Sequence, residues 1–69
     1  MNQLTAIDEW VRLFASRDEL AQEYATLLRT RPANWGGWPV LNLAIVDRWS
    51  ESGLAYVKRQ AWKIAEGQA

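Results

Sequence analysis

The stretch PVLNLAIVDRW, residues 39–49, is apolar on nearly every side of a helix. A short helix that is apolar all round is typical of a central, buried element, and this one is far shorter than the roughly 20 residues that cross a bilayer. We therefore expect residues 39–49 to form the central helix of an all-helical domain. The residues expected to be buried in it are Val40, Leu41, Ala44, Ile45 and Trp49.

Two amphipathic helices are expected upstream of this stretch. The first covers residues 5–15, with Thr5 as its N-cap and an apolar face at helical spacing. The second covers residues 17–30, because its apolar stripe is rotated relative to the first. Ser16 and Glu19 form a capping box in which each satisfies the other's free backbone amide. The alternative is one long, kinked helix. The apolar residues of the two stripes are Ile7, Trp10, Val11 and Phe14, then Leu20, Ala21, Tyr24, Leu27 and Leu28.

Downstream, a loop and a fourth helix are expected. Pro32 ends the second helix, and Pro39 fits the first turn of the next one. The segment SESG, residues 50–53, interrupts the central helix, and Ser50 or Ser52 can cap a final helix over residues 51–66. The inner face of this final helix carries Leu54, Val57, Ala61, Ile64 and Ala65.

The fold class expected is all-α: one domain over residues 1–69, a compact bundle of three to four short helices around a buried central helix. A chain of 69 residues has little core, and this one has neither cysteine nor histidine. Disulfides and the commonest metal ligands are thereby excluded, so we expect no metal and no cofactor. Packing of five tryptophans, two tyrosines and one phenylalanine must supply stability, with a homodimer as a further route.

Charge is balanced overall but not along the chain. Eight basic and eight acidic residues cancel, which disfavours binding that depends on phosphate attraction alone. Residues 1–28 carry a net charge of −3 and residues 29–69 a net charge of +3, so the two halves are expected to attract each other. No signal peptide or membrane span is visible, and we expect a cytoplasmic protein that does not bind membranes.

No group of residues predicts a reaction. The neighbouring carboxylates Asp8 and Glu9 lie at a helix start, and so do Asp18 and Glu19. There they interact favourably with the positive end of the helix dipole. The serines have no histidine to activate them. We therefore expect a non-enzymatic binding protein.

The loop ANWGGWP, residues 33–39, carries the main functional hypothesis. Tryptophan and arginine dominate the energetics of protein interfaces, so an aromatic and arginine surface here predicts a protein partner. A tiny, cysteine-free, tryptophan-rich chain is typical of small phage-type regulators, adaptors or inhibitors. The structural alternative is that both rings pack back over the core, and a weaker alternative is nucleotide binding. We expect the two rings to differ, with Trp38 buried and Trp35 the more exposed. The predicted partner-binding residues are Arg29, Arg31, Trp35, Trp38 and Trp62.

Residues 40–63 resemble a helix-turn-helix. Leu43 and Ala44 take the apolar and small positions of its first helix, and Trp49, Leu54 and Val57 take later core positions. The chain departs from the pattern at Arg48, where the turn usually has glycine, and at Asp47, where an apolar residue is usual. The resemblance implies DNA binding, with Glu51, Ser52 and Ala55 facing base edges and Lys58, Arg59 and Lys63 holding phosphates. A plain helical hairpin is the alternative.

Overall fold

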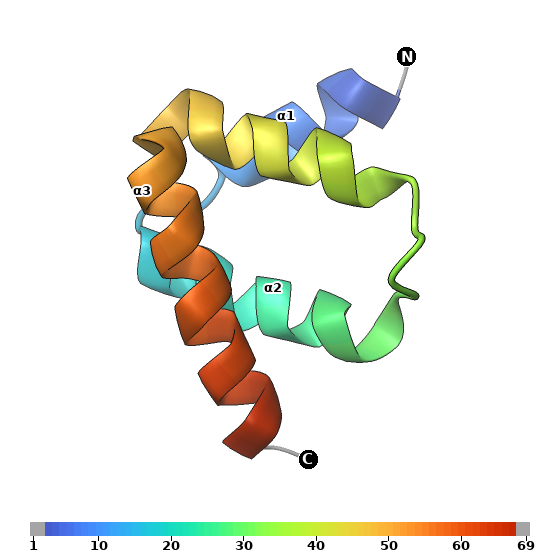
Figure 1. Ribbon diagram of the computed structural model, residues 1–69. Helices are drawn as coiled ribbons and strands as arrows, with labels where there is room; N and C mark the ends of the chain where they lie inside the picture. The colour runs from blue at the N-terminus through green and yellow to red at the C-terminus, as the bar shows by residue number, and fades with distance from the viewer. Residues whose placement is uncertain (1–2, 68–69) are drawn as a thin grey trace.

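The computed structural model describes residues 3–67 and contains three helices (Figure 1). These are α1 (Gln3–Arg12), α2 (Arg17–Thr30) and α3 (Gly37–Gly67). The helix α3 bends sharply at Ser50, whose φ of 70° and ψ of 177° are not helical, so it consists of two helical halves, residues 37–49 and 51–67. Within residues 3–67 there is no strand, and the prediction of a small all-helical bundle is confirmed.

The first helix differs from its prediction at both ends. It already includes Gln3, so Thr5 lies within the helix and the predicted N-cap at Thr5 is wrong. Its regular part ends at Arg12 rather than at residue 15. The amide of Leu13 then donates to the Trp10 carbonyl at 3.1 Å, and the amide of Phe14 to the Val11 carbonyl at 3.3 Å. These bonds span three residues and tighten the last turn before the chain leaves the helix.

The break between α1 and α2 follows from local chemistry at Ser16. This residue is extended, and its hydroxyl accepts a hydrogen bond of 3.2 Å from the amide of Glu19. The Glu19 carboxylate in turn accepts a hydrogen bond of 3.0 Å from the amide of Ala15, one residue before the cap. The start of α2 is therefore satisfied by a variant of the capping box. Two helices form, and the alternative of one long helix is wrong.

The core lies where both α1 and α2 pack against α3. Ile45 and Leu41 in the first half of α3 are buried, and so is Ala44. The expected burial on all sides is nevertheless incomplete: Val40 and Trp49 are half-buried, and 66% of Leu43 is exposed. Two short neighbouring helices cannot cover every side of a third. The buried apolar residues are Val11, Leu20, Ala21, Tyr24, Ala25, Leu41, Ala44, Ile45, Val57, Ala61 and Ala65.

The bend at Ser50 is held by close packing on its inner side. Gly53 is buried, and a β-carbon there would collide with the Cβ of Trp49.

The second half of α3 also contacts the start of α2, because the Tyr56 hydroxyl donates to the Asp18 carboxylate at 2.6 Å. The Arg17 guanidinium lies 4.7 Å from the centre of the Tyr56 ring. The hydrogen bond to Asp18 raises the pKa of Tyr56, with smaller contributions from burial and from the carboxylate charge.

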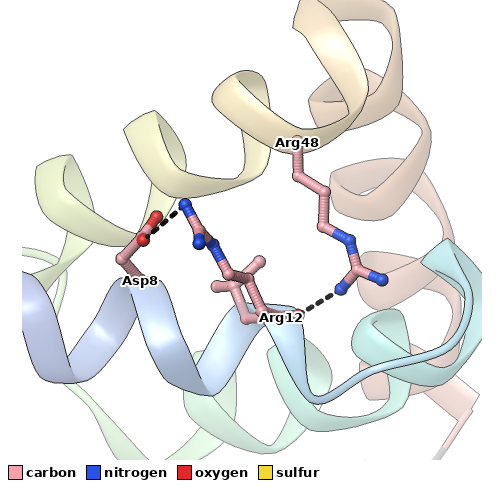
Figure 2. Close-up of polar contacts among 4 residues, drawn as sticks. Asp8, Arg12 and Arg48 are labelled. Atoms are coloured by element: carbon pink, nitrogen blue, oxygen red, sulfur yellow. Dashed lines mark hydrogen bonds and ion pairs between the residues drawn. The ribbon is translucent and has the colours of Figure 1, made fainter.

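A side chain of α3 joins its first half to the end of α1 (Figure 2). Arg48 donates from Nη1 to the carbonyl oxygen of Val11, while its guanidinium lies 4.3 Å from the centre of the Trp49 ring. A cation here satisfies a carbonyl in the last turn of α1 and interacts favourably with the negative end of the helix dipole. On α1 itself, Arg12 forms an ion pair of 3.1 Å with Asp8, one turn earlier.

We predict that Ile45→Ala lowers the free energy of unfolding by about 2–5 kcal/mol. The Ile45 side chain is fully buried among α1, α2 and α3, so truncation removes apolar contact and leaves a cavity. Urea unfolding followed by circular dichroism measures the change. A loss below 0.5 kcal/mol, of the size typical of surface positions, would contradict the central position of this helix.

A second prediction concerns the backbone at Ser50. Its φ and ψ fall in a region that is essentially restricted to glycine and that costs about 1–3 kcal/mol for other residues. Glycine relieves this strain but gives the unfolded chain more freedom, so Ser50→Gly should raise the free energy of unfolding by about 1 kcal/mol.

The matched control is Ser52→Gly. The hydroxyls of Ser50 and Ser52 lie 2.9 Å apart, so both variants delete the same hydrogen bond. Ser52 is helical, however, and glycine there should destabilise by about 0.5 kcal/mol. Equal destabilisation by both variants in urea unfolding would show that Ser50 is not strained.

Candidate functional site: the tryptophan loop and its groove

Two tryptophans organise the connection between α2 and α3, called the tryptophan loop below: Trp35 lies in residues 31–36 and Trp38 in the first turn of α3. Their rings meet edge to face, with centroids 5.2 Å apart and an interplanar angle of 84°. The Trp38 indole donates from Nε1 to the Pro32 carbonyl at 2.8 Å, which closes the loop on itself. The ring of Trp35 lies over the backbone of Gly37, where any β-carbon would collide with it. Glycine at position 37 therefore lets the first ring approach the start of α3.

Both rings pack on the core and keep an exposed part. Trp38 lies 5.4 Å from the ring of Tyr24, whose hydroxyl donates to the side-chain oxygen of Asn42 at 2.9 Å. Burial raises the pKa of Tyr24. The expectation that Trp38 is buried is wrong: Trp35 and Trp38 are both half-buried. The ring of Trp38 packs against the rings of Tyr24 and Trp35, and these contacts leave part of it in solvent.

An open groove of about 290 Å³ lies beside Trp35. Its walls come from α1, α2, the loop and α3, and every lining side chain is apolar. The lining residues are Ala6, Ile7, Trp10, Leu27, Trp35 and Leu41. The contribution of α1 to the groove was not predicted, because helical spacing assigns Ile7 and Trp10 to a core-facing stripe. Their half-buried state shows that this stripe is only partly covered by α2 and α3.

A cation lies on the rim of this groove. The guanidinium of Arg31 is 5.4 Å from the centre of the Trp35 ring, an arrangement in which the charge is attracted to the face of the indole. Arg31 is exposed, and it follows the last residue of α2 in an extended conformation. The site therefore combines an apolar wall with one positive charge beside it.

The five residues predicted to bind a partner fall into two groups. Arg31, Trp35 and Trp38 are brought together by the contacts above, and Arg29 lies exposed in the last turn of α2. Trp62 belongs to the second half of α3, which lies on another side of the molecule from the loop (Figure 1). It is 53% exposed and does not contribute to the groove. Trp62 is therefore not part of the groove, which the sequence could not show because it gives no distance between these two segments.

The residues of the DNA-binding alternative all lie exposed on the second half of α3, namely Glu51, Ser52, Ala55, Lys58, Arg59 and Lys63. The connection before them is shorter than a helix-turn-helix turn, since Ser50 alone leaves helical geometry. Arg48, which replaces the usual turn glycine, is helical and holds the end of α1 instead. The positive φ lies two residues later, at Ser50.

Comparison with known proteins gives no family: no family description, curated protein or solved structure matches this chain. Within residues 3–67, no helix has the length and apolar character that crossing a membrane requires. In the same part of the chain, no three acidic side chains gather where they could hold a metal ion.

We predict that Trp38→Ala destabilises the fold by about 2–3 kcal/mol and Trp35→Ala by about 1–2 kcal/mol. These values are smaller than the 3–5 kcal/mol typical of a fully buried ring, because both rings are half-buried. The Trp38→Ala variant loses more stability because it also loses the hydrogen bond to the Pro32 carbonyl and the contact with the Tyr24 ring. The matched control is Trp62→Ala, an exposed ring whose removal should change stability by less than about 0.5 kcal/mol. Equal thermal melts for all three variants would refute this order.

Proposed function

We propose that this chain is a small protein-binding module whose groove receives a bulky apolar side chain of a protein partner. The observation that carries the proposal is the open, wholly apolar groove between α1, α2 and the tryptophan loop. Trp35 and Trp10 supply two of its walls. Tryptophan is enriched among the residues that contribute most to protein interfaces, especially where it lines a pocket for a partner's anchor.

The size and lining of the groove favour an anchoring side chain over a small-molecule ligand. Its volume of about 290 Å³ lies at the lower limit of ligand pockets. Such pockets also contain a few polar groups that orient the ligand, whereas all six lining residues here are apolar. A nucleotide would in addition need a free aromatic face, and Arg31 already stacks on Trp35. One or two apolar side chains fit these properties better.

The charge beside the groove defines the partner further. The exposed guanidinium of Arg31 lies over Trp35, so an acidic residue next to the apolar anchor would meet a cation. Pairing of opposite charges at the rim adds specificity and speeds encounter more than it adds affinity. The partner segment is therefore an amphipathic peptide with a large apolar residue and a neighbouring carboxylate. A regulator, adaptor or inhibitor could act through such a contact. The alternative function is duplex DNA binding through residues 40–63.

The test fills the groove without removing any core residue. Ala6 lines the groove and is exposed, so Ala6→Trp places a ring in the space that a partner's anchor would occupy. Peptides are first selected for binding to the wild-type protein from a random display library and are then titrated against variants by fluorescence anisotropy. We expect aromatic or leucine anchors beside Asp or Glu, and at least a tenfold loss of affinity in Ala6→Trp.

Two further variants sharpen the result. Ala55→Trp makes the same substitution on an exposed helical alanine away from the groove and should leave affinity unchanged. Arg31→Glu should weaken binding several-fold and favour peptides with Lys in place of the acidic residue. The proposal fails if no peptide is selected, or if selected peptides bind Ala6→Trp as tightly as the wild type.

A further inference from the structure

The cationic side chains divide into those with partners inside the fold and those without. Arg12 forms an ion pair with Asp8, and Arg48 donates to the Val11 carbonyl. Arg17 and Arg31 lie over the rings of Tyr56 and Trp35, respectively. Arg29 also has an interaction. Among residues 3–67, three cations make no hydrogen bond, ion pair or ring contact within the chain. These are Lys58, Arg59 and Lys63.

The three unpartnered cations share one exposed face with Trp62. Lys58 and Arg59 precede Trp62 by four and three residues, which places them one helical turn away on its side of α3, and Lys63 adjoins it. All three cations are exposed, and Trp62 is 53% exposed. The other tryptophans in residues 3–67 are all half-buried. Lys58 and Lys63 are about 7.5 Å apart along the helix axis, so the three charges extend over more than one helical turn.

We propose that this face binds a short single-stranded segment of nucleic acid. The three cations contact successive phosphates, and one unpaired base stacks on the indole of Trp62. Positive charges spread over more than one helical turn fit a chain of phosphates better than an isolated anion. An exposed aromatic ring among those cations is the combination used to bind single strands, since every base offers a face for stacking. Paired bases in a duplex have no such free face for Trp62.

The length of the site is limited by charge at both ends of this helix. Glu51 and Glu66 are exposed on the same half of α3, before and after the cations. These carboxylates repel a backbone that continues along the helix, so the contact covers only a few nucleotides. Binding is therefore weak and strongly dependent on salt. The face is separate from the groove, because none of its residues lines that space. The proposal of nucleic-acid binding is therefore independent of the proposal that the groove binds a protein.

The experiment titrates the full-length protein against a fluorescein-labelled 12-nucleotide oligo-dT and a 12-base-pair duplex at several salt concentrations. Three phosphate contacts on a single strand predict a slope of log K against log salt of about −2, at about −0.7 for each contact. Lys58→Gln, Arg59→Gln and Lys63→Gln should each flatten this slope by about 0.7. Trp62→Ala should weaken binding at least fivefold, and Trp62→Phe should retain part of the affinity.

Arg12→Gln is the matched control, because it removes one exposed positive charge from α1 and changes the net charge equally. It should leave the slope unchanged, and so should the groove-filling Ala6→Trp. The proposal is overturned if the protein does not bind oligo-dT at 20 mM salt. It is equally overturned if Arg12→Gln loses as much affinity for oligo-dT as the three variants at Lys58, Arg59 and Lys63. It is also overturned if the duplex binds more tightly than oligo-dT and its binding does not depend on Trp62.

Discussion

The contact between Trp49 and Gly53 determines how this chain can fold on itself. These residues lie on either side of Ser50, where the backbone takes a positive φ and α3 changes direction (Figure 1). Without a β-carbon at Gly53, the second half of α3 can approach the side chain of Trp49 closely. A straight helix of 31 residues would extend about 46 Å and could not remain beside α2 along its length. The bend lets one helix pack against both others.

Both candidate surfaces depend on this bend. The first half of α3 contributes Leu41 to the floor of the groove, next to side chains of α1, α2 and the tryptophan loop. The second half buries Val57 and Ala61, and it leaves its opposite side, with Trp62, in solvent. A helix of small buried residues can lie close to its neighbour while its long charged side chains point outward. The groove and the cationic face are thus separated by the same change of direction that creates the core.

The parts predictable from sequence are those fixed by neighbouring residues. Ser16 and Glu19 act within one helical turn, and Pro32 cannot continue a helix, so the limits of α2 follow from local chemistry. The groove could not be predicted, because its walls meet through tertiary packing of segments whose distances the sequence does not contain. Apolar periodicity also overstates burial at Leu43, since a pattern shows which side chains are able to be buried and not how much protein surrounds them.

The net charge of this molecule does not predict whether it binds an anionic partner. Eight cations and eight carboxylates cancel in the sequence, which argues against binding to nucleic acid. The fold changes that conclusion, because five of the eight cations already interact within the chain and the remaining three gather around Trp62. Attraction between exposed charges falls off over about 10 Å at 0.1 M salt, so a short anionic segment experiences the three cations near Trp62 more than the carboxylates of the other helices. A chain of zero net charge can therefore present a locally cationic surface, and its binding must weaken steeply as salt shortens that range.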